Sequence, residues 1–331
     1  MSKKLLLGST ALVGAFALAT PALADIEVTL SGQVEFVAQA ADDEAIDNGR
    51  GYFFAMDSET KIEAEGAADN GINYSAKVEL ETDADDDGGD VNADETRLAF
   101  WGGFGRVELG RDDGAADNMF IGGEDFQAGT GGIDGDGVNL NINGVEDSDD
   151  AAKITYFTPR VAGFQLGAAF TPDSGDAEND SDDDADDIEE HVDFGINFTT
   201  AAAGADVTLT AVGSIGDAEV GDEDLEDYGI GAGVEFAGLG LGVGYVFRED
   251  LDEGNQLTLG AKYGFGPAAV SVGYSYEDPD GGEESNVIVF SGDYGLFPGV
   301  TVKGDLSFND EDDDADGDST TAGLVAVQID Y

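Results

Sequence analysis

The chain lacks cysteine and has little positive charge. Among 331 residues there are 13 Lys and Arg against 73 Asp and Glu, so the formal net charge is −60. No disulfide can therefore stabilise an exported form, and nucleic acid is an unsuitable partner because the negative charge repels phosphate. The one histidine, His191, ends an acidic segment, and we expect it to be exposed and without a catalytic role. No Ser/His/Asp set, cysteine nucleophile or histidine-containing metal cluster can be assembled, so we predict no enzyme activity.

Long apolar runs are also missing, except at the start of the chain. Residues Leu5 to Ala24 carry no charge, two lysines precede them, and Ala22-Leu23-Ala24 matches an A-x-A cleavage site. We predict that residues 1–24 are a cleaved signal peptide, the alternative being an uncleaved anchor. The mature chain, 25–331, has no apolar run near the roughly 20 residues of a spanning helix. It is therefore either soluble outside the inner membrane or a β-barrel within a membrane.

Strict alternation of apolar and polar residues is the main pattern of the mature chain. It runs from Ile26 to Phe36 and recurs in sixteen segments, the last at Gly323 to Tyr331. This period of two predicts strands with one apolar face. The connections after odd-numbered segments are long and acidic, whereas those after even-numbered segments are short. Outer-membrane barrels sort their connections in this way, and a secreted sandwich or β-solenoid has no reason to do so. We therefore predict an all-β, 16-stranded antiparallel transmembrane barrel.

One connection, Asp112 to Ala152, is longer than the others and differs in composition. It is rich in glycine and acids and has no Lys or Arg, yet it carries large apolar residues such as Met119, Phe120 and Phe126. A structureless loop of this length is normally functional or disordered. Its apolar residues argue against disorder, so we expect the segment to fold onto another part of the chain.

Four stretches resemble the general diffusion porins of Gram-negative outer membranes, especially the alphaproteobacterial type. They are Glu27–Val34, Arg97–Arg111, Ile154–Phe164 and the C-terminal strand ending in Tyr331, where that family more often has Phe. The resemblance implies a homotrimer in the outer membrane, in contact with lipid and lipopolysaccharide. It also implies that the third extracellular loop, here 112–152, folds inward as a constriction loop.

The pore charges follow from the alternation and the resemblance together. The alternation places Lys61, Lys77 and Arg97 on the lumen side, with Arg111 at the loop end of the fifth strand. In the family such a basic cluster faces carboxylates of the constriction loop. The corresponding loop residues here are Glu124, Asp125, Asp134 and Asp136. Because the basic cluster is small, we do not expect a strong transverse field.

Acids outnumber bases on the predicted lumen wall, and rings of acid favour cations. The inward acids are Glu35, Asp57, Glu59, Glu63, Glu79 and Glu235. We therefore predict a cation-selective, water-filled channel for passive diffusion of small hydrophilic solutes and ions. A substrate-specific channel is the alternative on the same fold. The inward positions of two consecutive strands are mostly glycine, which we interpret as a sign of a wide lumen; they are Gly229, Gly231, Gly233, Gly240, Gly242 and Gly244.

The acidic loops raise a further hypothesis, calcium binding. Asp83, Asp85 and Asp87 fit the D-x-D-x-D-G pattern, with Asp94 at the twelfth position, although a calcium loop prefers Glu there and has flanking helices. We expect no required cofactor, with calcium as the candidate ligand. An acidic calcium-binding surface or adhesion protein is the alternative from another class. The excess of acid also indicates either a salt-loving host, since salt shortens the range of repulsion, or divalent ions that bridge the loops to lipid headgroups.

Overall fold

A computed structural model describes residues 26–41, 51–82, 92–130, 144–145, 148, 151–174, 188–218, 224–250, 254–279, 284–311 and 319–331. Almost all of these residues lie in strands, as the alternation predicted. The strands are β1 (Glu27–Ala41), β2 (Tyr52–Ala67), β3 (Asn73–Thr82), β4 (Asn92–Gly102), β5 (Gly105–Arg111), β6 (Ala152–Phe157), β7 (Phe164–Asp173), β8 (Ile188–Ala202), β9 (Ala205–Ala218), β10 (Leu225–Phe236), β11 (Leu239–Asp250), β12 (Gly254–Phe265), β13 (Ala268–Pro279), β14 (Ser285–Phe297), β15 (Val300–Glu311) and β16 (Ser319–Asp330). No helix in the described ranges is long and apolar enough to cross a membrane.

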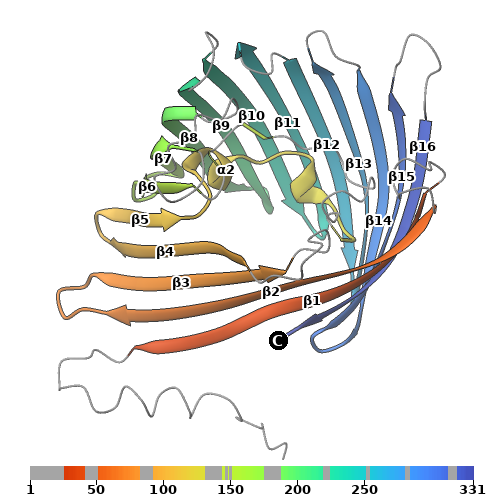
Figure 1. Ribbon diagram of the computed structural model, residues 1–331, viewed down its shortest axis with the longest axis horizontal. Coiled ribbons are helices and arrows are strands. Elements are labelled where there is room, and N and C mark those ends of the chain that lie inside the picture. The colour runs from red at the N-terminus through yellow and green to blue at the C-terminus, as the bar shows by residue number, and fades with distance from the viewer. Residues whose placement is uncertain are drawn as a thin grey trace, which may run out of the picture.

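The sixteen strands form one closed barrel in which each strand pairs antiparallel with its neighbours in sequence (Figure 1). Strand β1 closes the barrel against β16. At this seam Gly32 and Tyr331 exchange backbone hydrogen bonds, with N···O distances of 3.1 and 3.0 Å. The Tyr331 hydroxyl also shares a hydrogen bond of 2.6 Å with the Thr60 hydroxyl of β2. Closure pairs the backbone groups that an open sheet would leave exposed at its edges.

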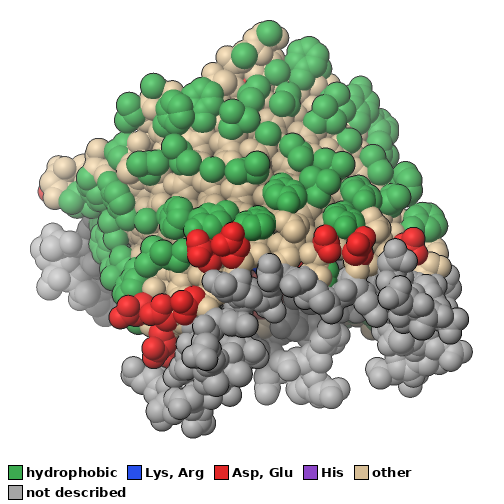
Figure 2. Space-filling view, turned by 90° about the horizontal axis from the view of Figure 1, so that it is seen from above, with side chains coloured by type: hydrophobic (Ala, Val, Ile, Leu, Met, Phe, Trp, Pro, Cys, Tyr) green, Lys and Arg blue, Asp and Glu red, His purple; other side chains and the backbone are tan. Residues whose placement is uncertain are grey.

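The outer face of the barrel wall is apolar, and its side chains are far more exposed than those of the inner face. On β16, Val325 and Ile329 are 57% and 51% exposed, whereas Leu324 is 3% exposed and Ala326 is fully buried. Figure 2 shows apolar side chains spread over one outer face of the barrel, with acidic side chains gathered along one edge of that face. An apolar outer band is what contact with lipid hydrocarbon requires of a barrel.

The connections are sorted as predicted. The turns after even-numbered strands are short, for example Ala203-Gly204 and Ala237-Gly238, whose residues all have positive φ angles between 52° and 85°. Two consecutive positive φ values match the type I′ geometry that suits two-residue hairpins. The described part of the third long connection contains a short helix, α2 (Ala115–Met119), and a 3₁₀ turn, η1 (Glu124–Phe126). Both lie inside the barrel (Figure 1), so this part of the connection folds inward as expected. The last predicted residue of the connection, Ala152, already belongs to β6.

Candidate pore constriction

Residues 112–130 of the constriction loop are bound to the lumen faces of β7 to β15, which we call the loop-bearing wall. Irregular backbone leaves N–H groups that need acceptors, and inward side chains of this wall supply four. The donor–acceptor pairs are Ala116 N to Asp193 Oδ1 (2.7 Å), Gly123 N to Thr258 Oγ1 (2.9 Å), Ala128 N to Ser271 Oγ (2.8 Å) and Thr130 N to Asp305 Oδ2 (3.1 Å).

Apolar packing adds to these hydrogen bonds. Met119 is buried in a cluster that includes Phe157 of β6, Ala169 of β7 and Val212 of β9. Phe126, 5% exposed, lies against the strands beneath η1. Full burial of a Met or Phe side chain contributes about 1.5–3 kcal/mol. The apolar residues that made the segment unusual as a loop are therefore the ones that hold it to the wall.

The inward glycines of β10 to β12 lie directly beneath this loop. A Cβ on Gly231 would overlap the carbonyl oxygen of Ile121, and one on Gly260 would overlap that of Gly123. A Cβ on Gly242 would meet the Phe126 ring. The interpretation of these glycines as a sign of a wide lumen is therefore wrong. These glycines have no side chains, and the loop fills the space that side chains would occupy.

Two of the four predicted loop carboxylates belong to η1. Thr258 Oγ1 donates to Glu124 Oε2 at 2.7 Å, and the Gly122 N–H donates to Asp125 Oδ2 at 2.8 Å. Burial raises the pKa of the Glu124 carboxyl, and the hydrogen bonds that it accepts only partly oppose this. The pKa of Asp125 is raised for the same reason, because the surrounding loop and wall displace water even though the residue reaches the lumen. Asp134 and Asp136 lie outside the described residues.

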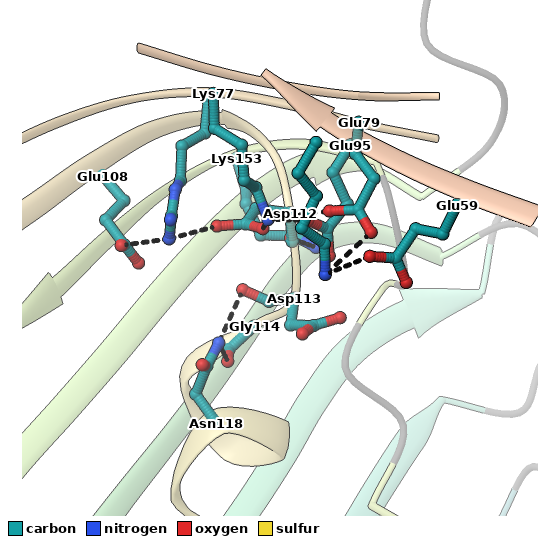
Figure 3. A network of polar contacts seen from close by, with 12 residues as sticks. Glu59, Lys77, Glu79, Glu95, Glu108, Asp112, Asp113, Gly114, Asn118 and Lys153 are labelled. Carbon is teal, nitrogen blue, oxygen red and sulfur yellow. Dashed lines mark hydrogen bonds and ion pairs between the residues drawn. The ribbon is translucent and has the colours of Figure 1, made fainter. Parts of the chain in front are cut away.

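On the opposite side of the lumen, β2 to β5 carry a chain of ion pairs, which we call the charged wall. Lys61, Lys77 and Arg97 all lie on this inward face, as predicted, and each contacts at least two carboxylates. Figure 3 shows the part of this network around Lys77 and Asp112. Lys61 Nζ lies 2.7 Å from Glu59 and 2.9 Å from Glu79. The positive charges of these bases are therefore compensated by carboxylates of the same wall and by Asp112.

Asp112, the first residue of the constriction loop, joins two of these bases. Its Oδ1 lies 3.1 Å from Lys77 Nζ, and its Oδ2 lies 2.9 Å from Arg97 Nη1. Lys153 Nζ of β6 donates to the Asp112 carbonyl oxygen at 2.6 Å. Arg97 Nη1 also lies 2.7 Å from Glu108 Oε1. The loop thus begins within the charged wall and continues across the lumen to the loop-bearing wall.

Arg111 does not join this cluster. In β5, Gly110 pairs with Arg97 and Arg111 pairs with Thr96. Directly paired residues share a face and successive residues alternate, so Arg111 leaves the strand on the outward side. The alternation within β5 would have placed it there, because Leu109, two residues earlier, also faces outward, 36% exposed.

Several charged residues of the lumen were not predicted. Arg106 Nε lies 2.6 Å from Glu108 Oε1 and its guanidinium lies 5.1 Å from the Trp101 ring centroid. Lys303 Nζ lies 2.8 Å from Glu35 Oε2, which compensates one of the predicted wall acids. The sequence contains these residues at inward positions of their strands, but only the register between strands shows which charges meet.

His191 also differs from expectation, because it is buried and not exposed. Its side chain is 1% exposed, and Nε2 forms a hydrogen bond with the Ser214 hydroxyl of β9. A bulge between Glu189 and Val192 shifts the register of β8 at this point. The residue is therefore part of the inner wall at the loop end of the barrel.

The predicted calcium site falls largely outside the described residues. This applies to Asp83, Asp85 and Asp87, whereas Asp94 lies in β4. Among the residues that the structure describes, no group of three or more Asp, Glu, His or Cys side chains is arranged to hold a metal ion. Calcium binding stays a prediction.

Comparison with known proteins gives the family. A family model described as Gram-negative porin matches residues 8–314. Among solved structures, an anion-selective porin from Comamonas acidovorans has a TM-score of 0.69 at 19% identity, covering 93% of this chain and 100% of its own. A loop-deletion mutant of OmpT, an outer membrane protein of Vibrio cholerae, has 0.67 at 13% identity, covering 92% and 99%. A mutant of a Rhodopseudomonas blastica porin has 0.68 at 18% identity, covering 92% and 100%.

A search of curated proteins gave no significant match. The structural likenesses, all below 20% identity, show the shared fold. The family model spans nearly the whole chain and therefore assigns the family as well as the fold. The chain therefore belongs to the Gram-negative porins, and its barrel is an outer-membrane channel for diffusion.

Proposed function

We propose that the protein is a cation-selective, water-filled channel through which small hydrophilic solutes and ions diffuse passively. The observation that carries the proposal is an imbalance between the two sides of the constriction. The bases Lys61, Lys77 and Arg97 are each bound by carboxylates of the charged wall. In contrast, Glu124 and Asp125 accept hydrogen bonds from a hydroxyl and a backbone N–H, which are uncharged groups.

Coulomb's law makes this imbalance large enough to select ions. A cation 4 Å from one carboxylate gains about 1 kcal/mol in bulk water and about 4 kcal/mol at an effective dielectric constant of 20. A compensated base opposes this attraction only weakly, because the field of its partner carboxylate cancels most of its own. Low-dielectric walls further concentrate the field of the acids within the channel.

The anion-selective porin from Comamonas acidovorans has a similar fold, so the fold alone does not determine the sign of selectivity. The lining charges must do so. The test is the zero-current potential of the reconstituted protein across a planar bilayer with a KCl gradient. We expect a K⁺/Cl⁻ permeability ratio above one. A ratio below one would refute the proposed selectivity, and a bilayer without conductance steps would refute the channel itself.

A substrate-specific channel on the same barrel is the rival proposal. A series of neutral sugars distinguishes the two, because a general channel slows sugars in order of size alone. Strong inhibition of the current by one sugar, out of this order, would favour the substrate-specific channel.

We also propose export with cleavage after Ala24 and assembly as a homotrimer in contact with outer-membrane lipid and lipopolysaccharide. The uncharged segment Leu5 to Ala24 supports the first part, and the family resemblance supports the second. The intact mass of protein extracted from outer membranes tests cleavage, and its mass in detergent tests the trimer. A chain that retains residues 1–24, or a monomer in mild detergent, would contradict them.

Calcium binding by Asp83, Asp85, Asp87 and Asp94 is a separate proposal that rests on their spacing. Calorimetric titration of calcium into the folded protein tests it. A saturable site is expected, and heats that do not saturate would count against one.

A further inference from the structure

We propose that Asp112 is a second determinant of the ion selectivity of the channel, besides the carboxylates of η1 that reach the lumen. It acts by neutralising Lys77 and Arg97. The inference rests on the proposed channel function and identifies a specificity-determining residue for it. Asp112 is only 6% exposed, so its role differs from that of an acid in the ion path. It acts through the charge of the two bases that it holds.

The contacts of Asp112 use both of its carboxylate oxygens. Oδ1 lies 3.1 Å from Lys77 Nζ and Oδ2 lies 2.9 Å from Arg97 Nη1. Figure 3 shows its carboxylate within this network, at the place where the loop leaves the wall. Charge-assisted contacts of this length are about twice as strong as neutral hydrogen bonds. One carboxylate therefore binds two cations of different strands.

Asp112 supplies one of the five carboxylate charges that take part in the ion pairs of this cluster. The bases of the cluster are Lys61, Lys77, Arg97 and Arg106, with Lys153 at the Asp112 carbonyl oxygen. The carboxylates that they contact are Glu59, Glu79, Glu95, Glu108 and Asp112. Removal of the Asp112 charge makes this part of the wall more positive by one unit, and the lost charge is the one that Lys77 and Arg97 share.

The variant Asp112→Asn should still fold, because neither base loses all of its partners. Lys77 keeps Glu79, at 3.4 Å, and Glu95. Arg97 keeps Glu108, at 2.7 Å. The asparagine also retains the backbone carbonyl that accepts from Lys153. The substitution therefore changes the charge of the wall and leaves most of its hydrogen bonds in place.

The experiment measures the K⁺/Cl⁻ permeability ratio from zero-current potentials of the full-length protein and its variants. Asp112→Asn should lower the ratio at least fivefold, because one unit charge about 4 Å from an ion in bulk water changes the permeability of that ion about fivefold and acts in opposite directions on K⁺ and Cl⁻. Asp112→Glu, which keeps the charge, should retain the wild-type ratio. Asp112→Asn combined with Lys77→Gln restores the net charge of the cluster and should return the ratio toward the wild-type value.

Asp112→Asn could change selectivity because Asp112 no longer masks, that is neutralises, Lys77 and Arg97, or because the loop is displaced. Neutral-sugar exclusion, measured on the same channels, separates the two, because masking predicts an unchanged sugar cut-off in Asp112→Asn. An unchanged permeability ratio would overturn the inference, and so would a changed cut-off that Lys77→Gln does not reverse. Absence of channels in the wild type would refute the proposed function, and the inference with it. An anion-selective wild type would refute only the proposed selectivity, because the direction of the Asp112→Asn shift still tests the masking.

Discussion

The two sides of the lumen carry different side chains because one faces pore water and the other is covered by the constriction loop. The charged wall, β2 to β5, faces pore water and carries long ionised side chains in compensated pairs such as Arg97 with Glu108. The loop-bearing wall is covered by protein and carries glycine or short hydroxyl side chains, for example Gly231 and Thr258. Glycine permits close approach of a second backbone, whereas a paired charge keeps a wall polar where water and ions pass.

The contrast shows that one residue type can have different roles on the two sides of the lumen. Asp112 and Asp305 are both inward acids of low exposure. Asp112 binds two bases, whereas Asp305 accepts hydrogen bonds from the Thr130 backbone and hydroxyl at 3.1 and 3.0 Å. The same carboxyl group thus compensates charge on one wall and anchors the loop on the other.

The largest effect is expected from a methyl group on the loop-bearing wall. Gly231→Ala would place Cβ on the Ile121 carbonyl oxygen, so the loop must move toward the lumen. Overpacking of this kind typically costs about 1–3 kcal/mol, and we expect a lower single-channel conductance or a noisier open state. The matched control is Gly264→Ala on β12, which has free space around its Cβ, the closest atom being the Gly238 carbonyl oxygen at 3.9 Å. Equal conductance of the two variants would contradict the close contact.

A smaller effect on conductance is expected when one anchor of the loop is removed, because the other hydrogen bonds between the loop and the wall remain. Asp305→Ala deletes the acceptor for the Thr130 N–H and hydroxyl, and hydrogen bonds to a charged group contribute about 1.5–3 kcal/mol each. The open-channel current noise should rise, because the loop end near Thr130 gains freedom. Asp305→Asn keeps an acceptor oxygen and should show less noise than the alanine variant. Identical noise in both variants and the wild type would exclude an anchoring role.

Acid should weaken cation selectivity through the loop before it affects carboxylates that are fully surrounded by water. The protein around Glu124 and Asp125 displaces water and raises the pKa of both carboxyls, so these groups become protonated, and neutral, at a higher pH than fully hydrated acids do. As the pH falls from neutral, the K⁺/Cl⁻ ratio should therefore decrease early. A double variant, Glu124→Gln with Asp125→Asn, should begin at a lower ratio and lack this early decrease. The same pH profile in both proteins would exclude η1 as its source.

The smallest effect belongs to a residue outside both walls, and it tests whether conductance depends on the walls alone. Tyr331→Phe removes the hydroxyl that shares a hydrogen bond with Thr60 at the barrel seam. The loss of one neutral hydrogen bond should lower the free energy of unfolding by about 0.5–1.5 kcal/mol. Denaturant unfolding in detergent should detect this, with conductance and selectivity unchanged. Altered selectivity would show that the walls do not act independently of the seam.

Much of the barrel was predictable because a strand's faces can be read from period-two alternation. Lys61, Lys77 and Arg97 were placed on the lumen face in this way, and the loop from Asp112 was located by its composition and its place after the fifth strand. The contacts were not predictable, because alternation assigns each residue to a face of the sheet. It does not give the register between strands, and it does not show which segment packs on that face. This is why the partners of Lys77 and the loop above Gly231 appear only in the structure. Arg111 shows a different error, since the alternation within β5 already pointed it outward.

If the constriction loop narrows the path of the ions, a single cysteine on η1 makes the narrowing measurable. The chain has no cysteine, so Asp125→Cys would be its only thiol, at an exposed position of η1. Addition of a bulky, water-soluble thiol reagent during single-channel recording should lower the conductance in discrete steps. Ala128→Cys, at a buried position against the wall, should react far more slowly. Complete labelling of Asp125→Cys, verified by mass, with unchanged conductance would show that η1 does not border the path of the ions.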